Sequence, residues 1–106
     1  MSPRAEVITF WARGRGKNSS ATMNMLLYDD NPNGTYVYAL EVTLSPEWKQ
    51  HVVRLSDFKP MNVAAKGTTL APGRVRMVGF ESPGGLGQIL ELQIDSLRVE
   101  AARTGK

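Results

Sequence analysis

The side chains of this sequence that could do chemistry are mostly aromatic, amide and charged groups, and the clearest of them is Trp11. Alternation along residues 7–13 places Trp11 on the side of a strand opposite Phe10 and Ala12. A flat indole can pack against the apolar face of a pyranose ring, while amide, carboxylate and guanidinium groups hydrogen-bond the hydroxyl groups of the sugar. The pattern predicts a sugar-binding surface around Trp11. An ordinary solvated sheet face with one exposed tryptophan would give the same pattern.

The remaining binding candidates are polar or aromatic residues that alternation or a nearby turn brings to the surface. They are Asn24, Tyr36, Tyr38, Glu41, Trp48, Gln50, Arg76 and Gln93. Tyr36 and Tyr38 share the core side of their strand, but they lie beside a predicted hairpin turn, where an aromatic ring can reach the rim of the sheet. Structural packing is the alternative for each of these residues, and for Trp48 it is the favoured one.

Catalytic chemistry finds little support. The chain has a single histidine, His51, which alternation places half-buried beside Val53, and it has no cysteine. No nucleophile-elbow motif is present around which a Ser-His-Asp triad could form. Glu41, Glu81 and Glu91 could supply a carboxylate pair for glycoside hydrolysis, but a small sandwich without long loops is a poor host for that reaction. We expect a protein that is not an enzyme.

The densest cluster of oxygen-bearing side chains is residues 29–34, Asp-Asp-Asn-Pro-Asn-Gly. Closely spaced carboxylates and amides are ligands that calcium prefers. The same residues are also those of a tight turn, and turn chemistry explains them without a metal ion. The turn is the favoured interpretation.

The bulk composition is that of one ordinary globular domain. The 106 residues are 42% hydrophobic and 22% charged, and no apolar run approaches the roughly 20 residues of a membrane-spanning helix. The net charge of +3 and the pI near 9.5 invite a nucleic-acid hypothesis. The basic residues, however, form only the short groups 13–17 and 74–76, with acidic residues scattered between them. We therefore expect neither a nucleic-acid nor a membrane partner.

Strand patterns separated by turn residues account for most of the chain. They cover residues 7–13, 21–28, 35–44, 48–55, 74–81 and 88–100. Turns are expected at 14–16, 45–47 and 82–85, and a hairpin loop of about six residues at 29–34. Residues 56–73 form a long connection, and only 45–50 could form a helical turn. The pattern predicts an all-β antiparallel β-sandwich (jelly roll) in one domain, residues 1–106, with an ordered core over about 6–100.

Five short motifs give the chain a resemblance to a known group of domains. They are Phe-Trp-Ala-Arg-Gly-Arg-Gly at 10–16, Leu-Tyr-Asp at 27–29, Leu-Ser-Pro-Glu-Trp at 44–48, Val-Arg-Leu-Ser-Asp-Phe-Lys-Pro at 53–60 and Leu-Gln-Ile-Asp-Ser-Leu-Arg-Val at 92–99. In this order they resemble the carbohydrate-binding modules of the galactose-binding-like jelly-roll group, which occur in bacterial polysaccharide hydrolases. The complex I intermediate-associated proteins share this fold.

The resemblance implies a secreted, non-catalytic module that binds a β-linked plant polysaccharide of the β-glucan or xyloglucan type. Its partner would be a glycoside hydrolase catalytic domain in the same extracellular protein. The resemblance also implies a structural calcium ion with Asp95 as one ligand. Members of the group usually have one or two strands ahead of the motif at 10–16, so the other calcium ligands are not identified in this sequence. The alternative is a protein-interaction domain of the assembly-factor type, which would use the same face for a partner protein.

Overall fold

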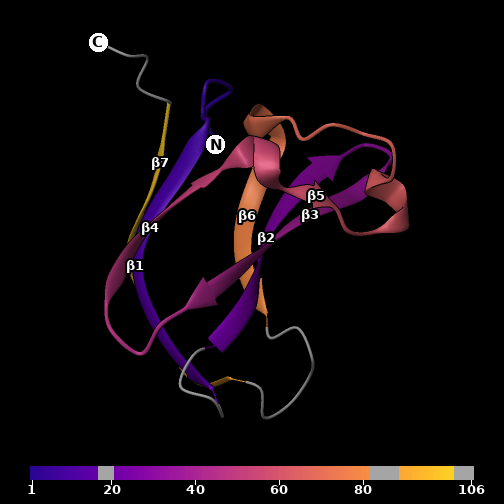
Figure 1. Cartoon of the computed structure of the whole chain (residues 1–106). Coiled ribbons are helices and arrows are strands. Elements are labelled where there is room, and N and C mark those ends of the chain that lie inside the picture. The colour runs from indigo at the N-terminus through magenta and orange to yellow at the C-terminus, as the bar shows by residue number, and fades with distance from the viewer. Residues whose placement is uncertain (17–20, 82–88, 102–106) are drawn as a thin grey trace.

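The chain folds into two antiparallel β-sheets that pack as layers of a sandwich, which confirms the predicted fold class (Figure 1). The computed structural model describes residues 1–16, 21–81 and 89–101. The three-stranded sheet has the order β4-β1-β7, with β1 at Val7–Gly16, β4 at Lys49–Arg54 and β7 at Ile89–Glu100. The four-stranded sheet has the order β5-β3-β2-β6, with β2 at Ala21–Asn31, β3 at Gly34–Leu44, β5 at Lys59–Pro60 and β6 at Val75–Glu81.

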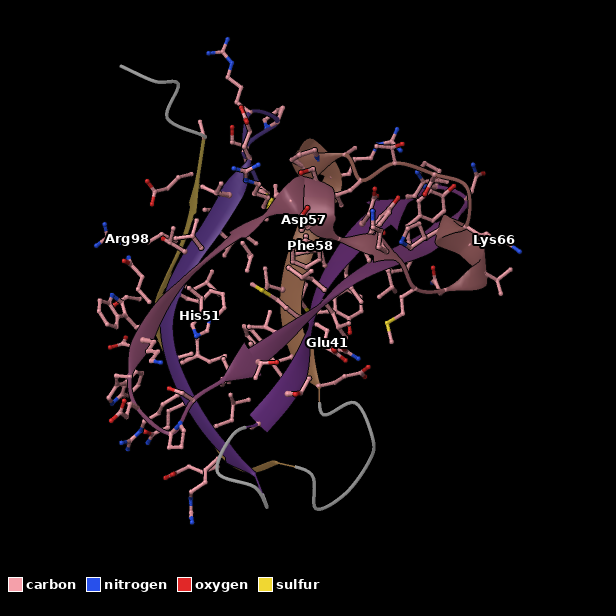
Figure 2. All side chains as sticks on the ribbon, in the orientation of Figure 1. Glu41, His51, Asp57, Phe58, Lys66 and Arg98 are labelled. Atoms are coloured by element: carbon pink, nitrogen blue, oxygen red, sulfur yellow. The ribbon has the colours of Figure 1, made fainter. Side chains whose placement is uncertain are left out.

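Alternate strand residues turn toward the space between the sheets and form the core, as the sequence predicts. In β1, Ile8, Phe10 and Ala12 are fully buried. The four-stranded sheet contributes the buried side chains of Met23, Met25, Leu27, Tyr38, Val42 and Leu44. His51 lies on the core side of β4, where its ring stacks on Phe10 with the centroids 5.2 Å apart (Figure 2). The faces of β1 that point to the core and to solvent are therefore those that the alternation predicts.

The hairpin of β2 and β3 has a tighter turn than the sequence predicts. The two strands pair until Asn31 lies opposite Gly34, so Pro32 and Asn33 alone form the turn, and the expected six-residue loop is wrong. The side chain of Asn31 accepts a hydrogen bond from the backbone N–H of Asn33 at 2.9 Å, and Gly34 has a φ of +124°. Residues 29–31 continue the ladder because their backbone groups find partners in β3, which outweighs their turn propensity.

Residues 14–16 belong to β1 and do not form the predicted turn. Gly14 pairs with Leu92 of β7, and its N–H donates to the carbonyl of Ser45 at 2.8 Å. A Cβ atom at Gly14 would lie 3.0 Å from Cδ1 and 3.1 Å from Cβ of the buried Leu44. The glycine is needed because Leu44 approaches the backbone closely, and not because the chain turns there.

The connection between β4 and β6 contains β5 and three 3-10 turns, at Leu55–Asp57, Val63–Ala65 and Pro72–Arg74. Asn62 holds it against β3: its Oδ1 accepts from the N–H groups of Val37 and Ala65, and its Nδ2 donates to the carbonyl of Thr35. The helical turn that 45–50 could have formed is absent, since these residues make a bend and the start of β4. None of the helical turns in the described part of the chain is long and apolar enough to cross a membrane.

Candidate functional site

The outer face of the three-stranded sheet presents Trp11 at its centre. Trp11 lies on the middle strand, opposite Gln50 of β4 on one side and Asp95 of β7 on the other. Its side chain is 44% exposed. The amide of Gln50 and the carboxylate of Asp95 are also exposed. A large flat ring is thus flanked in register by two groups that can hydrogen-bond hydroxyls.

A second indole lies beside this row. Trp48 directly precedes β4 and is 43% exposed, so the interpretation of Trp48 as a core residue is wrong. The guanidinium of Arg13 lies over its ring, 5.3 Å from the centroid. Arg13 also donates from Nε to Oε1 of Gln93, the residue opposite it on β7. These contacts hold the arginine between the second ring and a neighbouring amide, and a cation over an aromatic face stabilises that arrangement.

The pairing of β1 with β7 is interrupted directly beside Trp11. Thr9 lies opposite Arg98 and Trp11 opposite Asp95, so two residues of β7, Ser96 and Leu97, face the single Phe10. Such a β-bulge redirects the side chains of its strand. Ser96 has a φ of +56°, a conformation that costs a residue other than glycine on the order of 1 kcal/mol. Strain of this kind is often found where a ligand binds.

The bulge borders a shallow cavity of about 210 Å³. It is lined by Thr9, Trp11, Gln50, Ser96, Arg98 and Glu100. The hydroxyl of Thr9 donates to Oε2 of Glu100 at 3.3 Å. No carboxylate among the described residues lies within ion-pair distance of the Arg98 guanidinium. The cavity therefore places hydrogen-bonding groups of both polarities beside an exposed indole.

The structure divides the predicted binding residues between two opposite faces. Trp11, Trp48, Gln50, Gln93 and Asp95 gather on the outer face of the three-stranded sheet. Asn24 and Glu41 are paired with each other on the outer face of the four-stranded sheet, and Arg76 is exposed on β6 of the same sheet. Figure 2 shows Arg98 and Glu41 on the two outer sides of the sandwich. The sequence predicts one binding surface for all these residues, whereas the structure places them on the outer faces of two different sheets.

The two tyrosines of β3 point to the core, as their alternation indicates. Tyr38 is 1% exposed, and its hydroxyl is hydrogen-bonded to the hydroxyl of Thr68. Tyr36 is half-buried and packs against the core cluster. Tyr38 does not reach the rim of the sheet as expected, because the strand pairing holds its ring between the sheets.

A larger cavity of about 1170 Å³ extends along β4 and β5, the edge strands of the two sheets. Its aromatic residues are Tyr38 and Phe58, which are 1% and 5% exposed. Neither ring offers a face to a ligand. Among the aromatic residues of the described chain, Trp11 and Trp48 are exposed, and Tyr28, Tyr36 and Phe80 are half-buried.

The described residues do not assemble a calcium site. Asp95 is exposed beside Trp11, and no group of three or more Asp, Glu or His side chains gathers within residues 1–16, 21–81 and 89–101. Of the cluster at 29–34, Asp29 is buried in the core, and the side chain of Asn31 is engaged in its own turn. Hard oxygen ligands of calcium must converge on one point, and these residues do not. Calcium binding stays a prediction without support from this geometry.

Sequence reasoning missed Thr9, Ser96, Arg98 and Glu100. A signal for the bulge was present, because the apolar residues of the last strand change from even positions, Leu92 and Ile94, to odd ones, Leu97 and Val99. Such a change in a strand of period two requires one extra residue. The change places Arg98 and Glu100 on the same face as Trp11.

Comparison of the chain with family models, curated proteins and solved structures finds no match. The resemblance to carbohydrate-binding modules therefore rests on the sequence motifs alone.

Proposed function

We propose that the protein is a non-catalytic carbohydrate-binding domain, and that it binds a β-linked polysaccharide of the β-glucan or xyloglucan type on the outer face of the three-stranded sheet. The observation that carries the proposal is Trp11, an exposed indole on the central strand with Gln50 and Asp95 in register on either side. A sugar ring stacked on the indole would have its hydroxyl rim within reach of both groups.

The openness of this face supports a polysaccharide and a modest affinity. In the described part of the chain the residues of this face are exposed, so a chain of sugars could enter and leave across the sheet surface. Trp48, with Arg13 over its ring, provides a second aromatic contact on the same face. One or two stacked rings with several exposed hydrogen bonds correspond to binding of roughly −5 to −8 kcal/mol, which is micromolar or weaker. The domain would act by holding a linked hydrolase near its substrate.

The test is affinity electrophoresis of the whole chain in gels containing soluble β-glucan or xyloglucan, with Trp11→Ala as the variant. We expect the wild type to be retarded and Trp11→Ala to lose at least about tenfold in affinity, because the stacking surface is gone. Thermal unfolding should be unchanged, since this side chain lies outside the core.

Met77→Ala is the matched control, because Met77 is a large apolar residue, 56% exposed, on the other sheet. It should be retarded like the wild type. Retardation that survives Trp11→Ala would overturn the assignment of the site. If no polysaccharide retards the wild type, carbohydrate binding is wrong, and the protein-interaction alternative takes its place.

A further inference from the structure

The last strand, β7, forms one edge of the three-stranded sheet. Within the described residues it pairs with β1 along one side and with no strand along the other. It is 12 residues long and contains neither proline nor glycine. The other edge strands, β4, β5 and β6, are shorter, and β5 contains Pro60. The backbone N–H and C=O groups along an open edge are available to pair with a further strand.

The core side of β7 is less buried than that of the neighbouring β1. Leu97 and Val99 follow the bulge on this side, and Val99 lies opposite Ile8. Ile8 is fully buried, whereas Leu97 and Val99 are each 37% exposed. A strand added at this edge would reduce the exposure of both apolar side chains, because cross-strand neighbours on one face of a sheet pack against each other.

Two opposite charges flank the bulge on the outer side of β7. Asp95 lies opposite Trp11 and Arg98 opposite Thr9, so both side chains belong to the outer face. Both are exposed, and neither forms an ion pair with another described residue. In an antiparallel neighbour the order of the two charges is reversed. The strand β7 is therefore complementary to a second β7.

We propose that the protein forms a two-fold symmetric dimer in which the β7 strands of two copies pair antiparallel along this edge. In this register, Asp95 of each copy lies opposite Arg98 of the other, and Ile94 lies opposite Val99 on the core side. Each pair occurs twice, because a two-fold interface is self-complementary. The bulge adds one residue between the members of each pair, and this brings them onto the same face of the sheet.

Charge favours this register over its neighbours. A shift by two residues in one direction brings Glu100 opposite Glu91, and a shift in the other direction brings Glu100 opposite Asp95. Like charges directly opposite each other destabilise a strand pair, whereas opposite charges stabilise it. The two-fold axis would pass through the sheet, so both Trp11 side chains would lie on the same face of one continuous sheet. The inference does not depend on the proposed carbohydrate-binding function.

The test is the mass of the whole chain in solution, measured by sedimentation equilibrium over a series of protein concentrations. We expect the wild type to reach twice the 11.7 kDa of one chain. Asp95→Arg and Arg98→Asp should each raise the dissociation constant of the dimer by at least about tenfold, since each replaces two attractive pairs with two repulsive ones. The double variant Asp95→Arg/Arg98→Asp restores the attraction and should dimerise like the wild type.

Arg76→Asp is the matched control, because it reverses the charge of an exposed strand residue on the other sheet. It should dimerise like the wild type. A wild type that stays monomeric at every concentration would overturn the dimer. Equal dissociation constants for the wild type and both single variants would overturn the β7 interface. A double variant that dimerises no better than the single variants would overturn the pairing of Asp95 with Arg98.

Discussion

Single side chains on β1 and β4 show how neighbouring positions take opposite roles. Trp11 and Gln50 face solvent, while the next pair in the register, Phe10 and His51, stack on each other on the core side. The Nε2 atom of His51 is buried and has no hydrogen-bond partner among the described residues. A neutral imidazole tolerates this environment better than a charged one, because burial penalises the charge.

The stability of the protein should therefore depend on the protonation of His51. Burial, and to a smaller extent the charge of Lys49, lower the pKa of His51 below its ordinary value of about 6.5. As the pH falls below about 6.5, the unfolded chain takes up the proton first, so the free energy of unfolding decreases until the pH passes the pKa of the folded state. Urea unfolding between about pH 8 and pH 5 measures this loss.

His51→Phe is the control for this prediction, because it keeps a ring against Phe10 and removes the titrating group. Its stability should fall less over the same pH range than that of the wild type. Parallel pH profiles for the two proteins would show that His51 is not responsible.

At the level of elements, β1 pairs with β4 and β7 along its edges and packs against β3 of the other sheet. These contacts restrict different parts of the strand in different ways. Its early part positions Trp11, and the bulge of β7 opposite Phe10 opens the cavity next to that ring. In its last part, the backbone at Gly14 lies against the side chain of Leu44 of β3, which leaves no room for a side chain at position 14. The strand thus continues through residues that usually turn, because its pairing with β7 continues.

Gly14→Ala should destabilise the protein by about 1–3 kcal/mol, because the added methyl group overpacks the core against Leu44. Urea denaturation measures the loss. In a Leu44→Ala background the contact with Cδ1 is removed, whereas the contacts with Cβ of residue 44 and Cβ of Ala21 stay, so the added cost of Gly14→Ala should be partly relieved there. An equal cost in both backgrounds would show that Cδ1 of Leu44 does not contribute to the overpacking.

On the scale of the whole molecule, the sandwich separates two polar surfaces. Strand alternation alone does not distinguish them, because it does not show to which sheet a strand belongs. Trp11 is on the outer face of one sheet, and Asn24 and Glu41 are on the outer face of the other, with the core between them. The residues of one surface cannot contact a sugar ring held on the other.

Asn24→Ala and Glu41→Ala should therefore leave the affinity for β-glucan unchanged, whereas Gln50→Ala should lower it. The same electrophoresis assay measures all three. All three are polar strand residues; Glu41 and Gln50 are exposed, and Asn24 is half-buried. A loss of affinity in Asn24→Ala or Glu41→Ala comparable to that in Trp11→Ala would move the binding surface to the four-stranded sheet.

Local properties of the chain were sufficient to predict the β-sandwich, most of its strands and the buried side of the strands, except for the part of β7 after the bulge. Alternation has a period of two within one strand, so the exposure of Trp11 and the burial of Phe10 follow from neighbouring residues. Strand pairing, in contrast, joins residues that are far apart in the sequence. Only the tertiary structure decided that Gln50 and Asp95 flank Trp11, that Asn24 and Glu41 lie on the opposite face, and that Tyr38 is enclosed in the core. The physical reason is that register, bulges and the choice of neighbouring strand depend on how the backbone hydrogen bonds of the whole chain are satisfied together.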